Sequence, residues 1–248
     1  THNLLTLQHM SPAKRVQKAT EAIRAYGKLA GILNCYRWRC WIEDISFPYA
    51  DPESFAFVKQ RVDADQRLQL SFIHPMMEQM AHLMEKAGVD GSVSIFANGY
   101  WQVWQKLRRM ARSRKSSLSN FSSVNDMISF RLTTASEDKN QCYALLGAVN
   151  SFFGPYLDND RFDDFIAYPQ NGYRAIQVTA WMPDYGAIEV AITTPEMEGE
   201  NMWGVVYAIK NGQETSQYRP VEILTPSGGA RFLRDGSSVL DAVASIQQ

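Results

Sequence analysis

Two carboxylates in this sequence stand where they could hold a divalent metal ion. Asp126 opens a stretch at residues 127–134 that is typical of an apolar strand, and Glu189 lies within a second stretch of this kind at 187–194. Adjacent strands would bring the two side chains together, and Mg²⁺ accepts paired carboxylates while it bridges phosphate oxygens. The alternative is that Asp126 caps a turn and Glu189 is a solvated strand residue, and the residues alone favour it.

Other polar groups give weaker indications of chemistry. The run Asn171-Gly172-Tyr173 suits a ligand-binding loop, but Asn-Gly is also a common turn. A basic run could receive phosphates or RNA, although a solvated helix end is the simpler interpretation. That run consists of Arg108, Arg109, Arg112, Arg114 and Lys115.

Composition describes a chain that can bury a sizeable core. It has 248 residues, 45% of them hydrophobic, and a net charge of −1, so no global field attracts nucleic acid or membrane. Its three cysteines make no even disulfide framework and indicate reduced thiols in a cytoplasmic protein. There is no apolar run of the ~20 residues that a membrane span needs, and no signal peptide is recognisable. We expect the chain to be an internal piece of a longer polypeptide.

Periodicity and turn residues predict helices first and an α/β unit afterwards. Ser11-Pro12 begins a helix that Asn34 closes, a short helix covers 37–46, and a third runs from Asp51-Pro52 to Gly88, interrupted at Pro75. Strands and helices then alternate in the order β-α-β-α-β-β-β-α, which favours a mixed sheet with packed helices. Their predicted ranges are 92–96, 100–111, 127–134, 139–153, 162–168, 175–182, 187–194 and 195–210, followed by strands at 221–226 and 231–234 and a helix at 239–248.

Residues 163–177 resemble the guanine-nucleotide-binding segment of the RelA/SpoT alarmone synthetases, which usually reads close to K-D-Y-I-A-x-P-K-x-N-G-Y-x-S-L-H. The residues shared with that pattern are Asp164, Ile166, Ala167, Pro169, Asn171, Gly172 and Tyr173. Asp163, Gln170 and Gln177 replace two lysines and a histidine. The resemblance implies that Tyr173 stacks on guanine and that Asn171 and Arg174 belong to the same nucleotide site.

Three further segments resemble the family. Asp126 and Arg131 match its D-L-x-x-x-R motif, which implies Mg²⁺ binding by Asp126 and ATP binding by Arg131; Glu189 matches the second acidic catalytic residue. In the ATP segment only Lys106 is kept, and bulky apolar neighbours suggest a cleft filled by side chains. The family's basic, hydroxyl and acidic residues are replaced by Phe96, Asn98, Gln102, Thr193, Glu198, Met202 and Ala208.

The resemblance covers nearly the whole chain and implies its organisation. It implies an α/β (α+β) fold in which a nucleotidyltransferase-like mixed sheet is flanked by helices, preceded by an all-α segment and followed by the start of a β-grasp TGS domain. The implied domains are the end of an HD hydrolase domain at 1–33, connecting helices at 34–90, a synthetase or pseudo-synthetase domain at 91–210, a linker at 211–219 and a partial TGS domain at 220–248.

Three functions remain open at this point. The first is a catalytically inactive synthetase domain of a SpoT-like enzyme, which regulates an alarmone hydrolase domain in the stringent response. The second is an active but divergent GTP/GDP diphosphokinase that uses Mg²⁺, and the third a module that binds GTP, GDP or ppGpp without turnover. The implied partners are the hydrolase and C-terminal regulatory domains of the same polypeptide, with ribosome contact only through the latter and no membrane.

Overall fold

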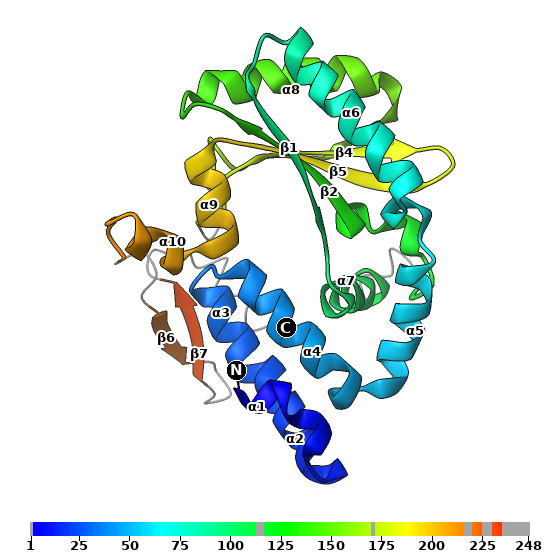
Figure 1. Cartoon of the computed structure of the whole chain (residues 1–248), viewed down its shortest axis with the longest axis vertical. Coiled ribbons are helices and arrows are strands. Elements are labelled where there is room, and N and C mark those ends of the chain that lie inside the picture. The colour runs from blue at the N-terminus through cyan, green and yellow to red at the C-terminus, as the bar shows by residue number, and fades with distance from the viewer. Residues whose placement is uncertain (1, 113–116, 170–171, 216–219, 225–229, 235–248) are drawn as a thin grey trace.

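The computed structural model begins with a bundle of helices (Figure 1). It describes residues 2–112, 117–169, 172–215, 220–224 and 230–234. The predicted first helix is one continuous helical run that begins with Pro12 at its first position and ends at Asn34, whose φ of 55° is left-handed. The helical segments are α1 (His2–Leu5), η1 (Leu7–His9), α2 (Pro12–Glu21), the π-helical η2 (Ala22–Gly27), α3 (Lys28–Ile32), α4 (Tyr36–Ala50), α5 (Pro52–Asp63), η3 (Gln66–Leu68) and α6 (Leu70–Lys86).

The interruption that we predicted at Pro75 lies earlier in the chain. The structure has its break at residues 64–69, and Pro75 lies within α6. The break is explained by Arg67, whose side chain is fully buried and donates to the carbonyl oxygens of Phe121, Val124 and Ala187 at 2.6–2.9 Å. A straight helix would not deliver this guanidinium to three acceptors in two other segments.

A five-stranded mixed sheet forms the second part of the fold, as predicted. Its order is β1-β2-β5-β4-β3, with β2 and β5 parallel and the other neighbours antiparallel. Figure 1 shows α6 and α8 on one face of the sheet and α7 and α9 on the other. The elements are β1 (Gly91–Ala97), α7 (Tyr100–Arg112), η4 (Phe121–Ser123), η5 (Asn125–Met127), β2 (Ile128–Thr134), α8 (Lys139–Phe153), η6 (Gly154–Tyr156), β3 (Leu157–Asp164), β4 (Ile176–Met182) and β5 (Gly186–Thr193).

Burial explains why these strands form where they do. All eight residues of β5 are buried, as expected for a central strand that is covered on both faces. The core continues into α6, which buries Phe72, Ile73, Met76, Met80, Leu83 and Met84 against the sheet.

The strand predicted at 162–168 is wrong at both ends, because β3 runs from Leu157 to Asp164. It stops there because Asp164 Oδ1 accepts hydrogen bonds from the backbone N–H groups of Ile166 and Ala167 and so begins a turn.

The last described elements differ from prediction at one glycine. The helix predicted at 195–210 is divided into α9 (Pro195–Trp203) and α10 (Val205–Lys210) by Gly204, which has φ 50° and ψ −124°. The strands β6 (Pro220–Leu224) and β7 (Ala230–Arg234) form an antiparallel pair, while the turn at 227–229 and the helix at 239–248 lie outside the described residues. No helix within the described ranges is long and apolar enough to cross a bilayer.

Candidate nucleotide site

The sheet topology explains how the two predicted carboxylates meet. In the parallel pair β2–β5, Ser129 lies opposite Glu189, and Asp126 precedes β2 by two residues. Glu189 is buried, and this burial, with a smaller contribution from the negative charge of Asp126, raises its pKa above the usual 4.5. The charge of Asp126 is therefore near enough to disfavour the ionisation of Glu189.

Lys106 on α7 already occupies this carboxylate pair. Its Nζ lies 2.7 Å from Asp126 Oδ1 and 2.5 Å from Asn125 Oδ1, and Asn125 Nδ2 donates to Thr179 Oγ1 on β4 at 2.9 Å. Among the described residues, no cluster of three or more His, Cys, Asp and Glu side chains is arranged to hold a metal ion. Of the two carboxylates that could hold Mg²⁺, Asp126 is therefore paired with Lys106, and Glu189 is buried with a raised pKa.

The N-terminus of α7 is filled by a carboxylate from α4. Asp44 accepts hydrogen bonds from the backbone N–H groups of Tyr100 (3.3 Å) and Trp101 (2.9 Å), although it lies more than fifty residues earlier in the chain. Gly99 permits this approach, because a Cβ there would lie 2.1 Å from Asp44 Oδ2. Unsatisfied N–H groups at a helix N-terminus are where proteins often bind phosphate. Here an internal anion takes that position.

The residues that replace the family's ATP-binding side chains also contact α4. Asn98 Nδ2 donates to the carbonyl oxygen of Asp126 at 2.9 Å, and Asn98 Oδ1 accepts from the hydroxyl of Tyr36 at 2.6 Å. The ring of Phe96 lies 5.3 Å from that of Tyr36, and Gln102 donates to the buried Glu43. Substitutions that the sequence presents as losses are therefore contacts between α4 and the sheet or α7.

Two aromatic residues at the start of α7 pack on α4 and α5. Trp101 packs on Phe47 with ring centroids 4.9 Å apart, and Tyr100 packs on Phe55 at 5.5 Å. They join α7 to α4 and α5.

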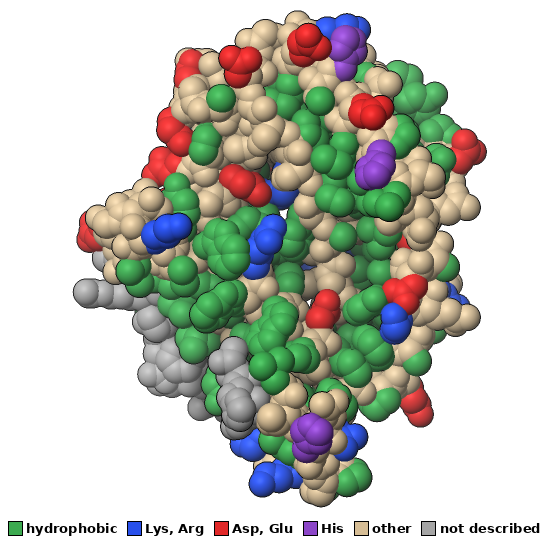
Figure 2. Space-filling view, viewed as in Figure 1, with side chains coloured by type: hydrophobic (Ala, Val, Ile, Leu, Met, Phe, Trp, Pro, Cys, Tyr) green, Lys and Arg blue, Asp and Glu red, His purple; other side chains and the backbone are tan. Residues whose placement is uncertain are grey.

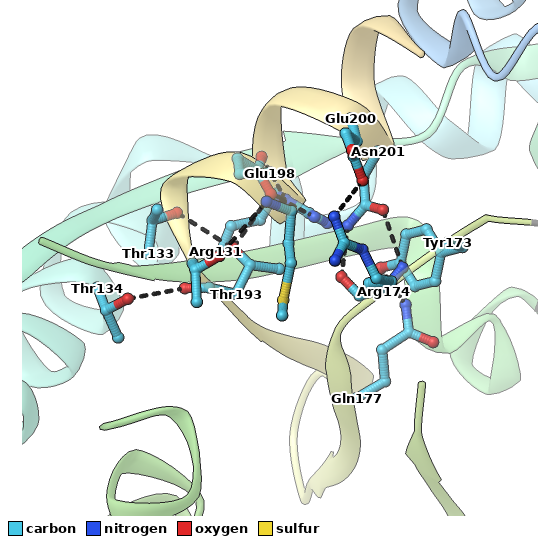
Figure 3. Close-up of polar contacts among 12 residues, drawn as sticks. Arg131, Thr133, Thr134, Tyr173, Arg174, Gln177, Thr193, Glu198, Glu200 and Asn201 are labelled. Atoms are coloured by element: carbon cyan, nitrogen blue, oxygen red, sulfur yellow. Dashed lines mark hydrogen bonds and ion pairs between the residues drawn. The ribbon is translucent and has the colours of Figure 1, made fainter. Parts of the chain in front are cut away.

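Arg131 on β2 is held by a carboxylate of α9. Its Nε and Nη2 lie 2.6–2.9 Å from the two carboxylate oxygens of Glu198, and only 5% of its side chain is exposed (Figure 3). Tyr173 lies beside this pair: its hydroxyl accepts from Gln177 Nε2 at 2.7 Å, and burial raises its pKa to about 12. The ring of Tyr173 meets that of Phe165 edge-on at 5.6 Å.

Arg174 is bound to α9 through both its side chain and its backbone. Its guanidinium pairs with Glu200, its N–H donates to Asn201 Oδ1 at 3.0 Å, and its carbonyl accepts from Asn201 Nδ2 at 2.8 Å. Asn171 and Gln170 lie outside the described residues.

One hollow at the helical end is separate from all of these residues. It measures about 350 Å³ and lies between α2, α3, α4 and α10, with Leu33, Ile42 and Val205 in its wall. Figure 2 shows hydrophobic side chains gathering over α3, α4 and α10 on this face. None of the predicted site residues lines it.

Comparison with known proteins matches part of the chain to a known family region. Residues 98–213 match the family described as "Region found in RelA / SpoT proteins". A GTP pyrophosphokinase of Myxococcus xanthus is 29% identical over 79% of this chain and 25% of its own length, and the bifunctional (p)ppGpp synthase/hydrolase SpoT of Escherichia coli is 27% identical over 87% and 30%. The chain therefore spans about a quarter to a third of those relatives.

Among solved structures, small alarmone synthetase 1 of Bacillus subtilis bound to its product pppGpp is similar to this chain at 14% identity. The match covers 66% of this chain and 84% of that one, with a TM-score of 0.41.

The RelA/SpoT match contains every predicted site residue but not α4. Sequence reasoning missed Asp44 and the roles of Glu198, Glu200 and Asn201. One signal of these missed partners was present in the sequence. A glutamate at 198 replaces a family histidine and so places a new negative charge near cationic positions.

Proposed function

We propose that this chain is a regulatory, catalytically inactive synthetase domain of a long RelA/SpoT protein. One observation carries the proposal: each described cation expected to bind nucleotide is paired with a carboxylate of the same chain. The pairs are Lys106–Asp126, Arg131–Glu198 and Arg174–Glu200.

A nucleotide would have to displace a carboxylate from each of these three cations in order to bind them. A charge-assisted hydrogen bond contributes about 1.5–3 kcal/mol, and a phosphate that displaces Glu198 from Arg131 gains one such set only by losing another. Displacement would also leave the partly buried carboxylates of Glu198 and Glu200 without their cations, which costs further free energy. The cations that should provide affinity therefore contribute little net binding.

The position of Asp44 supports the same conclusion. A phosphate that approaches the N-terminus of α7 would meet a carboxylate that already accepts hydrogen bonds from two N–H groups of α7. Two anions at one helix terminus repel each other, so binding would require α4 to move away from α7.

The regulatory part of the proposal concerns the longer protein. SpoT of Escherichia coli is named as both synthase and hydrolase, and this chain matches 30% of its length. A domain that keeps the synthetase fold without turnover would serve such a protein by holding its hydrolase and C-terminal parts in one arrangement. Control of that hydrolase is the function we propose.

A chromatographic synthetase assay tests the inactivity. The chain is incubated with ATP, Mg²⁺ and either GTP or GDP, beside small alarmone synthetase 1 of Bacillus subtilis as the active control. We expect neither AMP nor a tetra- or pentaphosphate product. Product that disappears in Glu189→Ala, but not in a variant of the exposed Glu78, would refute inactivity and establish the divergent diphosphokinase.

A binding measurement separates the remaining alternative. Calorimetric titration with GDP and ppGpp should give no saturable heat if the proposal is correct. Saturable binding that weakens in Tyr173→Ala would instead indicate a guanine-nucleotide module without turnover.

A further inference from the structure

Two turns that are far apart in the sequence meet through their backbones. The turn between α3 and α4 includes Leu33 and Asn34, and the turn between α9 and α10 is Gly204. A Cβ on Gly204 would lie 2.1 Å from the carbonyl oxygen of Leu33 and 2.5 Å from the carbonyl carbon of Asn34. The next amide, Val205 N–H, donates to that same Leu33 oxygen at 3.0 Å. Only glycine fits this position without displacing one turn from the other.

Side chains of the first turn bind the C-terminal end of α9. Asn34 Nδ2 donates to the carbonyl oxygen of Glu200 at 3.1 Å, and Cys35 Sγ donates to that of Trp203 at 3.3 Å. The carbonyl of Trp203 lies at the end of α9, where carbonyl groups lack helical partners, whereas that of Glu200 also accepts from Gly204 N–H at 2.8 Å. The N-terminal helices therefore hold one end of α9.

The other contacts of α9 reach the candidate nucleotide site. Glu198 holds Arg131, Glu200 holds the guanidinium of Arg174, and Asn201, which is 2% exposed, bonds to both backbone groups of Arg174 (Figure 3). Arg174 directly follows Tyr173. A helix of nine residues thus contacts the N-terminal turn at one end and the guanine segment along its length.

We propose that α9 couples the position of the α3–α4 turn to the conformation of residues 172–177. This inference rests on the proposed regulatory function and names the element that would carry the regulation. Because α9 is hydrogen-bonded to both regions, displacement of the turn by a domain attached to the N-terminal helices would move Asn201 and release the backbone of Arg174. Coupling of this kind is reciprocal, so a change at Arg174 also alters the turn.

A matched pair of glycine variants tests the coupling. Gly204 (φ 50°, ψ −124°) and Gly154 (φ 48°, ψ −117°) have nearly the same backbone conformation, but a Cβ on Gly154 meets nothing within 4 Å. Gly204→Ala and Gly154→Ala therefore both add backbone strain, which Pro155 increases further at position 154, and only Gly204→Ala pushes the two turns apart. The measurement is hydrogen–deuterium exchange by mass spectrometry on the intact chain without nucleotide.

In Gly204→Ala we expect the peptide covering residues 172–178 to exchange at least about 5-fold faster. A factor of about 5 corresponds to the smallest coupling usually seen between two sites. Gly154→Ala should leave that peptide unchanged, and a peptide from α8 should be unchanged in the Gly204 variant. Faster exchange confined to residues 33–36 and 200–210, or equally fast exchange in α8, would overturn the coupling.

Two milder substitutions keep the test decisive if Gly204→Ala does not fold. Asn34→Gly retains the left-handed backbone while it removes the bond to Glu200, and it should also speed exchange at 172–178. Asn201→Ala should speed exchange at residues 33–36, which shows reciprocity. No change in either remote peptide refutes the proposal. No nucleotide is used, so the coupling can fail while the absence of synthetase activity stands.

Discussion

The Arg131–Glu198 pair offers the sharpest test of how this site is held together. In Glu198→Ala the guanidinium of Arg131, whose side chain is 5% exposed, loses its three close contacts to the Glu198 carboxylate and keeps the neutral hydroxyl of Tyr173 as a nearby partner. Breaking a buried ion pair costs about 3–5 kcal/mol, because the remaining charge stays buried without its counter-ion. Glu198 is 22% exposed, so water reaches the vacated position and the lower end, about 3 kcal/mol, applies.

That loss is large enough to measure by thermal and urea unfolding. In a chain of this size each kcal/mol shifts Tm by about 2–4 °C, so we expect Tm to fall by about 6–12 °C. Glu21→Ala is the matched control, because Glu21 pairs with Lys18 on the surface of α2, where both side chains are well exposed. Pairs of that kind contribute about 0–1 kcal/mol.

A double variant separates the orphaned charge from the lost volume. Arg131→Met combined with Glu198→Leu replaces the pair with apolar side chains and should recover most of the stability. Apolar replacement of a buried ion pair is often neutral or stabilising. If Glu198→Ala unfolds no earlier than Glu21→Ala, Arg131 does not depend on Glu198. The guanidinium of Arg131 would then be available to a nucleotide phosphate.

Two further predictions concern the carboxylates. Burial raises the pKa of Glu189, so between pH 4.5 and the raised pKa the folded chain binds more protons than the unfolded chain, and stability declines as pH rises through that window. Glu189→Gln should therefore raise Tm at neutral pH, and the gain in Tm should shrink towards pH 4. A gain in Tm that is constant across the pH range would contradict the linkage. Asp44→Ala removes a cap that also joins α4 to α7, and we expect urea unfolding to show a loss of stability near the upper end of the usual range of about 0.5–2 kcal/mol. Asp51→Ala, whose cap is local to α5, should cost less stability. Equal losses would mean that the α4–α7 link contributes no stability beyond the cap itself.

The order of helices and strands could be read from the sequence because local patterns determine it. Apolar runs located four of the five strands, and Ser11-Pro12 and Asp51-Pro52 located two helix starts. The errors arose where a distant contact decides the local conformation. Arg67 breaks the third helix to reach carbonyl oxygens more than fifty residues away, and Gly204 divides the last helix where it meets Leu33.

The candidate site was predictable in position but not in its pairing. The positions of Asp126 and Glu189 followed from two adjacent strands, which a motif can indicate. The partners of the cations did not, since Glu198 lies 67 residues from Arg131 and Asp44 lies 57 from the amide of Trp101 that it caps. A substitution such as histidine to glutamate reads as a lost function in one dimension, and its new partner becomes visible only when the fold is known.

Arg67 also bears on how this protein can be cut into smaller pieces for study. A fragment that begins at residue 91 would contain the whole sheet but would lack this guanidinium and its hydrogen bonds to the carbonyl oxygens of Phe121, Val124 and Ala187. It would also expose the apolar surface that α6 covers. The shortest piece expected to fold therefore begins before Asp65, even though strand β1 starts at Gly91.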